Sequence, residues 1–424
     1  MRREKYMIAK KIIAAAAALA MLSTCAAGLT GCGDKSAEST AESAASTADT
    51  SSEEEKLPET DEEWHTAMIN KSLTSYGNVS KMQEKLKAAQ AGEKLNISYL
   101  GGSITEGVGA TPDTCWAKLT YDHIAEKFGT GENVNYNNAG ISGTPSKLGI
   151  LRLQRDVLST DPDICFVEFA VNDGMESDYQ NAYESIIRTL IENDVAVVLV
   201  FARTENDHTC QEYMQQQGEY YGLPMISYSD AIKYMFDNGK MVWQDFSDDQ
   251  SHPNEYGHTL VAEMIDNYFD TVMDQKAEEY TYPTEPINSI HEYGAQMLDN
   301  TNCKPEMENW EEGSTIAHFN EGWTHKYGDK NGTLKFTLTG RFVYLIYEEN
   351  NWGDYGKAHI TVTKDGEVYD EFDLDPVDKS GWGNPQTKCI GMSAKNAEYE
   401  IEITMADGED DRYFSVLGLA YTAD

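Results

Sequence analysis

The chain has 424 residues, with 72 acidic against 33 basic side chains, and its formal net charge at pH 7 is −39. This charge excludes nucleic acid and anionic lipid surfaces as partners, because a polyanion would be repelled. Hydrophobic residues make up 40% of the chain and aromatic residues 10%, which indicates a buried core and excludes an acidic disordered chain. At about 150 residues per domain, the length predicts two folded units.

The pattern of residues 1–31 predicts a secretion signal, because a segment with several basic residues precedes an apolar stretch at residues 12–22. That stretch is too short to span about 30 Å of hydrocarbon as a helix. It leads to Leu29-Thr30-Gly31-Cys32, which resembles a bacterial lipobox. The resemblance implies cleavage before Cys32 and acylation of its thiol, whereas the alternative is an ordinary signal peptide that is cut elsewhere. We expect a protein anchored in the cell membrane through Cys32 only, on the extracellular side.

Residues 32–60 predict a disordered tether, because they are rich in Ser, Thr, Ala and Glu and contain almost no large apolar side chain. Such a coil would span about 30 Å. Loss of residues 1–31 would remove five basic residues and one acidic residue. The remaining chain would hold 28 basic against 71 acidic side chains, a net charge of −43.

Residues 61–276 alternate short apolar runs with amphipathic stretches, a pattern that predicts a three-layer α/β sandwich with a parallel sheet. The predicted strands are Leu95–Leu100, Val134–Asn138, Asp163–Val171, Val195–Phe201 and Met225–Tyr228. The predicted helices are Glu62–Leu73, Val79–Ala91, Trp116–Phe128, Lys147–Leu158, Asp178–Asn193, Cys210–Tyr221 and Glu255–Thr271.

The pattern changes after this region. Residues 277–313 show no clear period and predict a connection between domains. Residues 314–424 contain short alternating runs bounded by turns, which predict an all-β, jelly-roll-like sandwich. Asp365-Gly366 is a hairpin signal between two of these runs. The predicted strands include Thr333–Leu338, Phe342–Tyr347, His359–Val362, Val368–Phe372 and Tyr399–Thr404.

A candidate nucleophile follows the first strand of the α/β region, in Gly101-Gly102-Ser103-Ile104-Thr105. Residues just beyond the carboxyl end of a parallel strand face the ligand crevice. The neighbouring glycines would let a substrate approach the Ser103 hydroxyl closely. Taken alone, a Gly-Ser turn is more often structural than catalytic.

A candidate base lies near the end of the α/β region, in Asp248-Asp249-Gln250-Ser251-His252-Pro253-Asn254. A serine nucleophile needs a neutral imidazole to accept its proton and a group that fixes the tautomer of that imidazole. Asp249 could orient His252 from within the same loop. Without Ser103, the ordinary interpretation of His252 would be a surface histidine.

Two further stretches lie at the ends of the second and third strands, Asn138-Ala139-Gly140-Ile141-Ser142 and Ala170-Val171-Asn172-Asp173. A glycine exposes its backbone N–H, and an asparagine offers a side-chain amide. Together with the N–H of Ser103, these groups could form an oxyanion hole, in which one donor contributes about 3–4 kcal/mol.

The four stretches, in this order, resemble the SGNH (GDSL) hydrolase superfamily over roughly residues 95–271. The resemblance implies a flavodoxin-like sheet and an esterase that needs no cofactor or metal. Gly102 stands where the family usually has Asp, and Ala170 where it usually has Gly, so local geometry could differ. The implied roles are nucleophile for Ser103, base for His252, orienting partner for Asp249, and oxyanion donors for Ser103, Gly140 and Asn172.

An ordinary α/β-hydrolase fits the sequence less well. The nucleophile elbow of that fold is G-x-S-x-G, and here Thr105 stands in place of the last glycine. Its acid and histidine also come from separate loops, whereas Asp249 and His252 are three residues apart.

A secreted, lipid-tethered hydrolase joined to a β-sandwich is similar to carbohydrate esterases that remove acetyl groups from polysaccharides. The expected partner is therefore an acetylated carbohydrate, and the acidic chain favours a neutral one. Trp352 and Trp382 are candidate glycan contacts because glycine and asparagine flank them, although either ring could instead pack in the core. The alternatives are a lipolytic esterase or thioesterase of the same fold, and a non-catalytic glycan-binding lipoprotein.

Five cysteines follow Cys32, and none belongs to a C-x-x-C pair, which argues against a zinc ribbon or a thioredoxin-like motif. A bridge between Cys303 and Cys389 is left open by the sequence.

Overall fold

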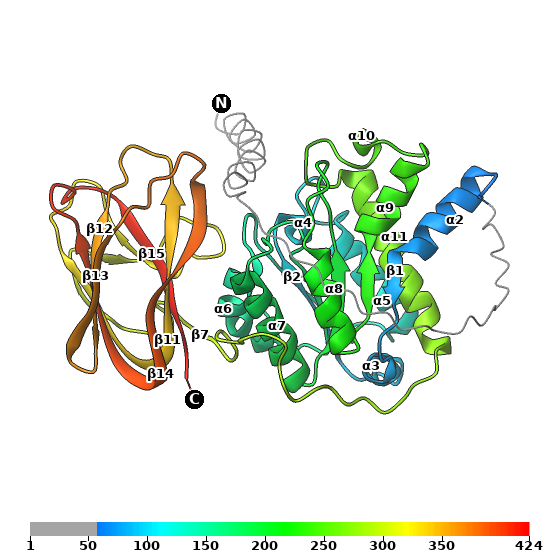
Figure 1. The fold of residues 1–424 in the computed structure, drawn as a ribbon, viewed down its shortest axis with the longest axis horizontal. Coiled ribbons are helices and arrows are strands. Elements are labelled where there is room, and N and C mark those ends of the chain that lie inside the picture. Colours follow the sequence, from blue (N-terminus) through cyan, green and yellow to red (C-terminus); the bar gives the residue numbers. More distant parts are fainter. Residues whose placement is uncertain (1–56, 424) are drawn as a thin grey trace, which may run out of the picture.

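The computed structural model describes residues 57–423, which form an α/β part and an all-β part (Figure 1). The predicted signal segment, the lipidation site at Cys32 and most of the predicted tether lie outside the described residues, so they stay predictions. Within residues 57–423, no helix is long and apolar enough to cross a membrane.

The α/β part is built on a six-stranded sheet with the order β1-β6-β5-β4-β2-β3. Five strands are parallel, and β1 runs antiparallel to β6 at one edge. The runs expected as strands at β2, β4 and β5 are buried almost throughout, and the parallel pairing of β2 to β6 confirms the parallel sheet. The strands are β1 Leu73–Ser75, β2 Leu95–Gly101, β3 Val134–Gly140, β4 Ile164–Glu168, β5 Ala196–Phe201 and β6 Met225–Ser227.

Helices cover both faces of this sheet (Figure 1). Helix α7 contacts α6 and α8 on one side, whereas α11 contacts α5 and α2 on the other. This is the predicted three-layer arrangement. The helices are α2 Asp61–Ser72, α3 Ser80–Gln90, α4 Ser103–Glu106, α5 Trp116–Phe128, α6 Ser146–Asp156, α7 Ser177–Glu192, α8 Gln211–Tyr220, α9 Tyr228–Asp237, α10 Trp243–Phe246 and α11 Glu255–Thr271.

The second part is an antiparallel sheet of nine strands in all. Seven of them follow the order β13-β12-β14-β11-β15-β10-β9, and the other two, β7 and β8, pair with β15 and β11. This confirms the predicted all-β domain. Asp365 and Gly366 both have positive φ, 51° and 84°, and join β12 to β13 as the hairpin signal predicts. The strands are β7 Gln296–Leu298, β8 Glu306–Glu308, β9 Glu311–Glu312, β10 Trp323–His325, β11 Thr333–Asn350, β12 Ala358–Lys364, β13 Glu367–Leu374, β14 Trp382–Met405 and β15 Phe414–Thr422.

Two long strands, β11 and β14, run through both layers of this sandwich. Their register shifts between Gly340 and Phe342; before the shift β14 also pairs with β12, and after it β11 also pairs with β15. Side chains from both halves, such as Phe336 and Leu345, belong to one buried cluster. The halves therefore face each other across a single core.

Cys303, Cys389 and the other three described cysteines are free.

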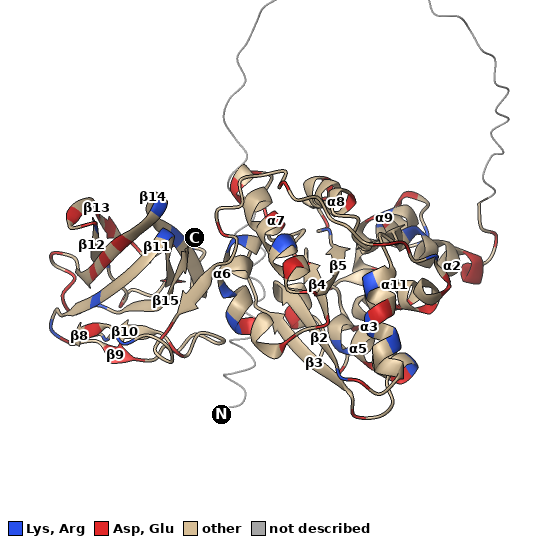
Figure 2. Cartoon of the chain, turned by 90° about the horizontal axis from the view of Figure 1, so that it is seen from below, with Lys and Arg blue, Asp and Glu red and all other residues tan. Residues whose placement is uncertain are grey.

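The two parts touch through α6, which contacts β7, β14 and β15. Met297, Ile346 and Leu417 of the β part are buried in the same apolar cluster as the α/β core. In Figure 2 the β15 side of the sandwich faces α6, and acidic residues are spread over both parts. An apolar interface of this kind favours a fixed arrangement of the two parts.

Candidate active site

The carboxyl ends of β2, β3 and β4 lie side by side. Gly101 at the end of β2 pairs in register with Gly140 on β3 and with Glu168 on β4. The loops that follow these strands therefore emerge at one edge of the sheet, as the sequence predicts. Ser103 and Asn172 both lie at this edge.

Ser103 is the first residue of the short helix α4 and is only 9% exposed. Its N–H lies in the first turn, where no intrahelical acceptor exists. The preceding Gly102 has no room for a side chain, because a Cβ there would lie 2.3 Å from Oδ1 of Asn172. The absence of a side chain at position 102 therefore lets the Asn172 amide lie against the nucleophile turn.

His252 and Asp249 complete a hydrogen-bonded chain with Ser103. Nε2 of His252 lies 2.8 Å from Oγ of Ser103, and Nδ1 lies 2.7 Å from Oδ2 of Asp249. Burial opposes ionisation of Asp249, but the hydrogen bonds and charge of His252 and the N–H of Ser251 lower the pKa of its carboxyl. An ionised Asp249 keeps a proton on Nδ1 and leaves the Nε2 lone pair for the Ser103 hydroxyl.

The loop that carries this pair is held by groups that the sequence analysis missed. The hydroxyl of Ser247 lies 2.8 Å from the carbonyl oxygen of Asp249 and 2.6 Å from that of His252. The indole N–H of Trp243, in α10, donates to the same Asp249 carbonyl. Both groups are buried, so the backbone of the loop that carries Asp249 and His252 is held by buried hydrogen bonds.

The side-chain amide of Asn172 makes no hydrogen bond within residues 57–423, and the residue is only partly buried. Its backbone N–H donates to Phe169 at 3.0 Å, which fixes the turn after β4. An unpaired amide beside Ser103 is free to donate to a substrate oxygen.

The structure contradicts the expectation for Gly140. Its N–H donates to Oδ1 of Asn138 at 2.9 Å, so this donor is already occupied. The N–H groups of Ile141, Ser142 and Thr144 also have acceptors. In the described chain, Gly143 has the only N–H between residues 140 and 144 without one.

Gly143 is exposed and has φ +71°, a conformation that glycine adopts without strain. Gly143 is therefore a better candidate than Gly140 for the second backbone donor. The glycine next to the expected motif was overlooked because spacing alone does not show which N–H is already bonded.

Two buried carboxyls lie beneath this edge. Burial, reinforced by the neighbouring Asp173, raises the pKa of Glu168 to about 7, although the Thr105 hydroxyl donates to it at 3.1 Å. Burial likewise raises the pKa of Asp173 to about 7, against hydrogen bonds from Ser146 and Tyr213. Both residues are almost fully buried.

Glu168→Gln is expected to stabilise the protein at alkaline pH. The folded-state pKa of Glu168, about 7, lies above its ordinary value of 4.5, so its contribution to stability is full below pH 4.5 and is lost as the pH rises to about 7. The loss amounts to about 3 kcal/mol, which the neutral amide avoids. Melting temperatures of the variant and the wild type should therefore differ at pH 8 and nearly coincide at pH 4.5. A variant that gives the same difference at both pH values would refute this role for Glu168.

Trp382 lies beside the candidate site, whereas Trp352 has no hydrogen bond or ring contact with a residue of that site within residues 57–423. A Cβ built on Gly143 would lie 3.0 Å from the ring of Trp382, so a side chain of the β part reaches the loop that holds the free N–H. Trp352 is 55% exposed and packs edge-on against Tyr355 with a ring separation of 6.0 Å. Neither ring fills the core of the sandwich.

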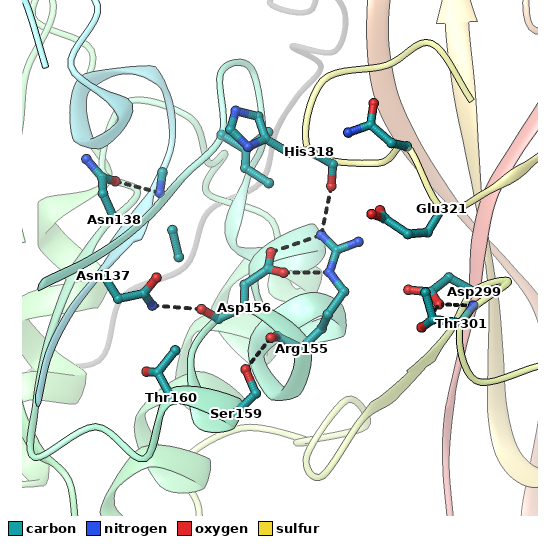
Figure 3. Close-up of a pocket in the computed structure, with 14 residues that line it drawn as sticks. Asn137, Asn138, Arg155, Asp156, Ser159, Thr160, Asp299, Thr301, His318 and Glu321 are labelled. Atoms are coloured by element: carbon teal, nitrogen blue, oxygen red, sulfur yellow. Dashed lines mark hydrogen bonds and ion pairs between the residues drawn. The ribbon is translucent and has the colours of Figure 1, made fainter. Parts of the chain in front are cut away.

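A polar cavity of about 480 Å³ lies between the two parts, next to the edge strand β3 (Figure 3). Ser103, His252 and Asp249 do not line it. Its walls come from β3, the end of α6 and the segment before β10. Among its residues are Asn137, Asn138, Arg155, Asp156, His318 and Glu321.

Comparisons with known proteins show which family and which fold this chain resembles. Residues 99–260 match the model of the GDSL-like Lipase/Acylhydrolase family. An arylesterase from Vibrio mimicus is 33% identical over 88 residues, which are 21% of this chain and 42% of that protein. The chain therefore spans less than half the length of this curated relative.

Two crystal structures of a two-domain esterase active on acetylated mannans superpose on both parts of the chain. Each has a TM-score of 0.73 and covers 84% of this chain and 98% of the other. The sequence identity is 26% for one structure and 24% for the other, which was co-crystallised with mannopentaose. The chain therefore shares the complete two-part architecture with this esterase.

Proposed function

We propose that this protein is a serine esterase that removes acetyl groups from carbohydrate through an acyl-enzyme intermediate. The observation that carries the proposal is the hydrogen-bonded chain from Asp249 through His252 to Ser103, with the unpaired Asn172 amide beside it. Nucleophile, base and orienting carboxylate are the three groups that acyl transfer requires.

In the proposed reaction, Oγ of Ser103 attacks the ester carbonyl while Nε2 of His252 takes its proton. The carbonyl oxygen becomes an oxyanion that accepts hydrogen bonds from the Asn172 amide and from the N–H groups of Ser103 and Gly143. His252 then gives its proton to the sugar oxygen, which leaves as a hydroxyl. The acetyl group stays on Ser103 until water, deprotonated by His252, attacks it and releases acetate.

The carbohydrate part of the proposal is supported by three features of the chain. The esterase with the same architecture, at 26% identity, is active on acetylated mannans. Trp382 reaches the active-site loop from the β part, where an aromatic ring can stack on a sugar face. Acidic residues cover both parts of the molecule (Figure 2), which favours a neutral glycan over an anionic one.

An acyl-chain series tests the proposed reaction. With 4-nitrophenyl acetate, butyrate and octanoate, we expect kcat/KM to be highest for acetate and to fall as the chain lengthens. A preference for longer chains would instead support a lipolytic esterase or thioesterase. Glycan binding without hydrolysis of any ester would indicate a non-catalytic glycan-binding protein.

A further inference from the structure

Glu106, the last residue of α4, joins three separate segments of the chain. It lies three positions after Ser103 in the same helical turn. Its Oε2 accepts the N–H of Ser142 at 2.8 Å and also the Ser142 hydroxyl. Its Oε1 lies 3.4 Å from Nε2 of His318, which belongs to the segment before β10. One carboxylate thus connects the nucleophile turn, the β3–α6 loop and the β part.

The β3–α6 loop is held tightly against the nucleophile turn. A Cβ on Gly140 would lie 2.2 Å from the backbone nitrogen of Glu106, and the N–H of Ile141 donates to Gly101 at 3.1 Å. Beyond these contacts, the bonds from Ser142 to Glu106 hold the residue directly before Gly143. The position of the free Gly143 N–H relative to Ser103 therefore depends on the Glu106 carboxylate.

The backbone of His318 has an unusual conformation and is bonded to α6. Its φ is +69°, which a residue with a side chain rarely adopts, and its carbonyl oxygen accepts a hydrogen bond from Arg155 at 3.1 Å (Figure 3). The neighbouring Phe319 is fully buried and packs 4.6 Å from the Arg155 guanidinium. These contacts hold the backbone at His318 and Phe319 against α6.

The charges around His318 favour its contact with Glu106. The hydrogen bond and charge of Glu106 raise the pKa of His318, with Asp156 adding to this effect and both burial and Arg152 opposing it. Burial opposes ionisation of Glu106, but the bonds from His318 and Ser142 lower its pKa. Glu106 is therefore an anion at neutral pH.

Resting on the proposed function, we infer that Glu106 is a positioning residue that holds the Gly143 N–H in place for the oxyanion, and that His318 of the β part completes this support. The β part then contributes to acyl transfer itself, even with an ester that carries no sugar.

Kinetics on 4-nitrophenyl acetate test the inference, because this substrate has no glycan for the β part to bind. Glu106→Ala is expected to lower kcat by up to about 100-fold and to leave KM within about twofold, as for a misplaced catalytic group. Glu106→Gln keeps an acceptor for the Ser142 N–H and should recover most of the loss. His318→Ala is expected to lower kcat several-fold, and to have no further effect when added to Glu106→Ala.

The control is His359→Ala, which should leave kcat unchanged. His359 lies on β12 and pairs with Asp373 and Glu371 on β13. A Glu106→Ala protein with kcat within twofold of wild type would overturn the inference. Equal effects of His318→Ala in both backgrounds would also overturn it. If Glu106→Ala fails to fold, the kcat values of His318→Ala, at a partly exposed residue, and of Glu106→Gln still test whether this contact supports acyl transfer. Failure of the serine-esterase chemistry on which the inference rests is recognised separately, because the wild type would then not hydrolyse 4-nitrophenyl acetate at all.

Discussion

Ser103→Ala is expected to lower kcat for 4-nitrophenyl acetate by about 10⁴- to 10⁶-fold, because the variant retains the oxyanion donors but has no nucleophile. The Ser103 hydroxyl makes its hydrogen bond to His252, and the α4 turn is held by backbone bonds from Glu106 to Gly102 and from Gly107 to Ser103. Loss of the hydroxyl should therefore leave the fold intact. Steady-state kinetics and the melting temperature, measured on the same preparation, check both statements.

The matched control for this variant is Ser159→Ala. Ser159 is exposed, follows α6 and bonds only to the backbone of Arg155, so its loss should leave kcat unchanged. Retention of more than about 1% of wild-type activity by Ser103→Ala would contradict the assignment of the nucleophile.

Asn172→Ala is expected to lower kcat by about 10²- to 10³-fold with little change in KM, because the amide donates to an oxygen that becomes charged only in the transition state. The amide has no other hydrogen bond in the described part of the chain, so its removal leaves no partner unsatisfied. Asn172→Asp should be at least as inactive, since it places a carboxylate beside the oxyanion. The measurement is kcat and KM for 4-nitrophenyl acetate.

Asn135→Ala serves as the control, because Asn135 is exposed at the opposite end of β3, where it bonds to Asn96. It should be as active as wild type. A decrease of less than fivefold for Asn172→Ala would remove Asn172 from the oxyanion hole, whereas a rise in KM alone would indicate a role in substrate binding.

The centre of the sheet that carries the site could be predicted from the sequence because β2, β4 and β5 are buried, largely apolar runs. Several short elements of the α/β part could not be predicted in this way. Strand β1 has only three residues directly after α2. Helix α9 begins where the β6 run was expected to continue, because Ser227 caps it by accepting the N–H of Asp230. Helix α10 has only four residues, too few for a helical period.

The candidate catalytic groups could be identified from the sequence because each lies within a short motif. The second backbone donor was placed wrongly at Gly140, since only the structure shows that the Asn138 side chain occupies its N–H and leaves that of Gly143 free. Contacts across the two parts lie beyond any motif. Glu106 meets His318, and Trp382 meets Gly143, only because the chain folds the β part against α6.

The central claim is that this site deacetylates carbohydrate, and release of acetate from acetylated glycans tests it most directly. Wild type and Ser103→Ala would be incubated with acetylated mannan, acetylated xylan and an acetylated anionic glycan, and free acetate would be measured. We predict that wild type releases acetate from a neutral glycan, faster than from the anionic one, and that Ser103→Ala releases none. If wild type hydrolyses 4-nitrophenyl acetate but frees no acetate from any glycan, the carbohydrate assignment is wrong.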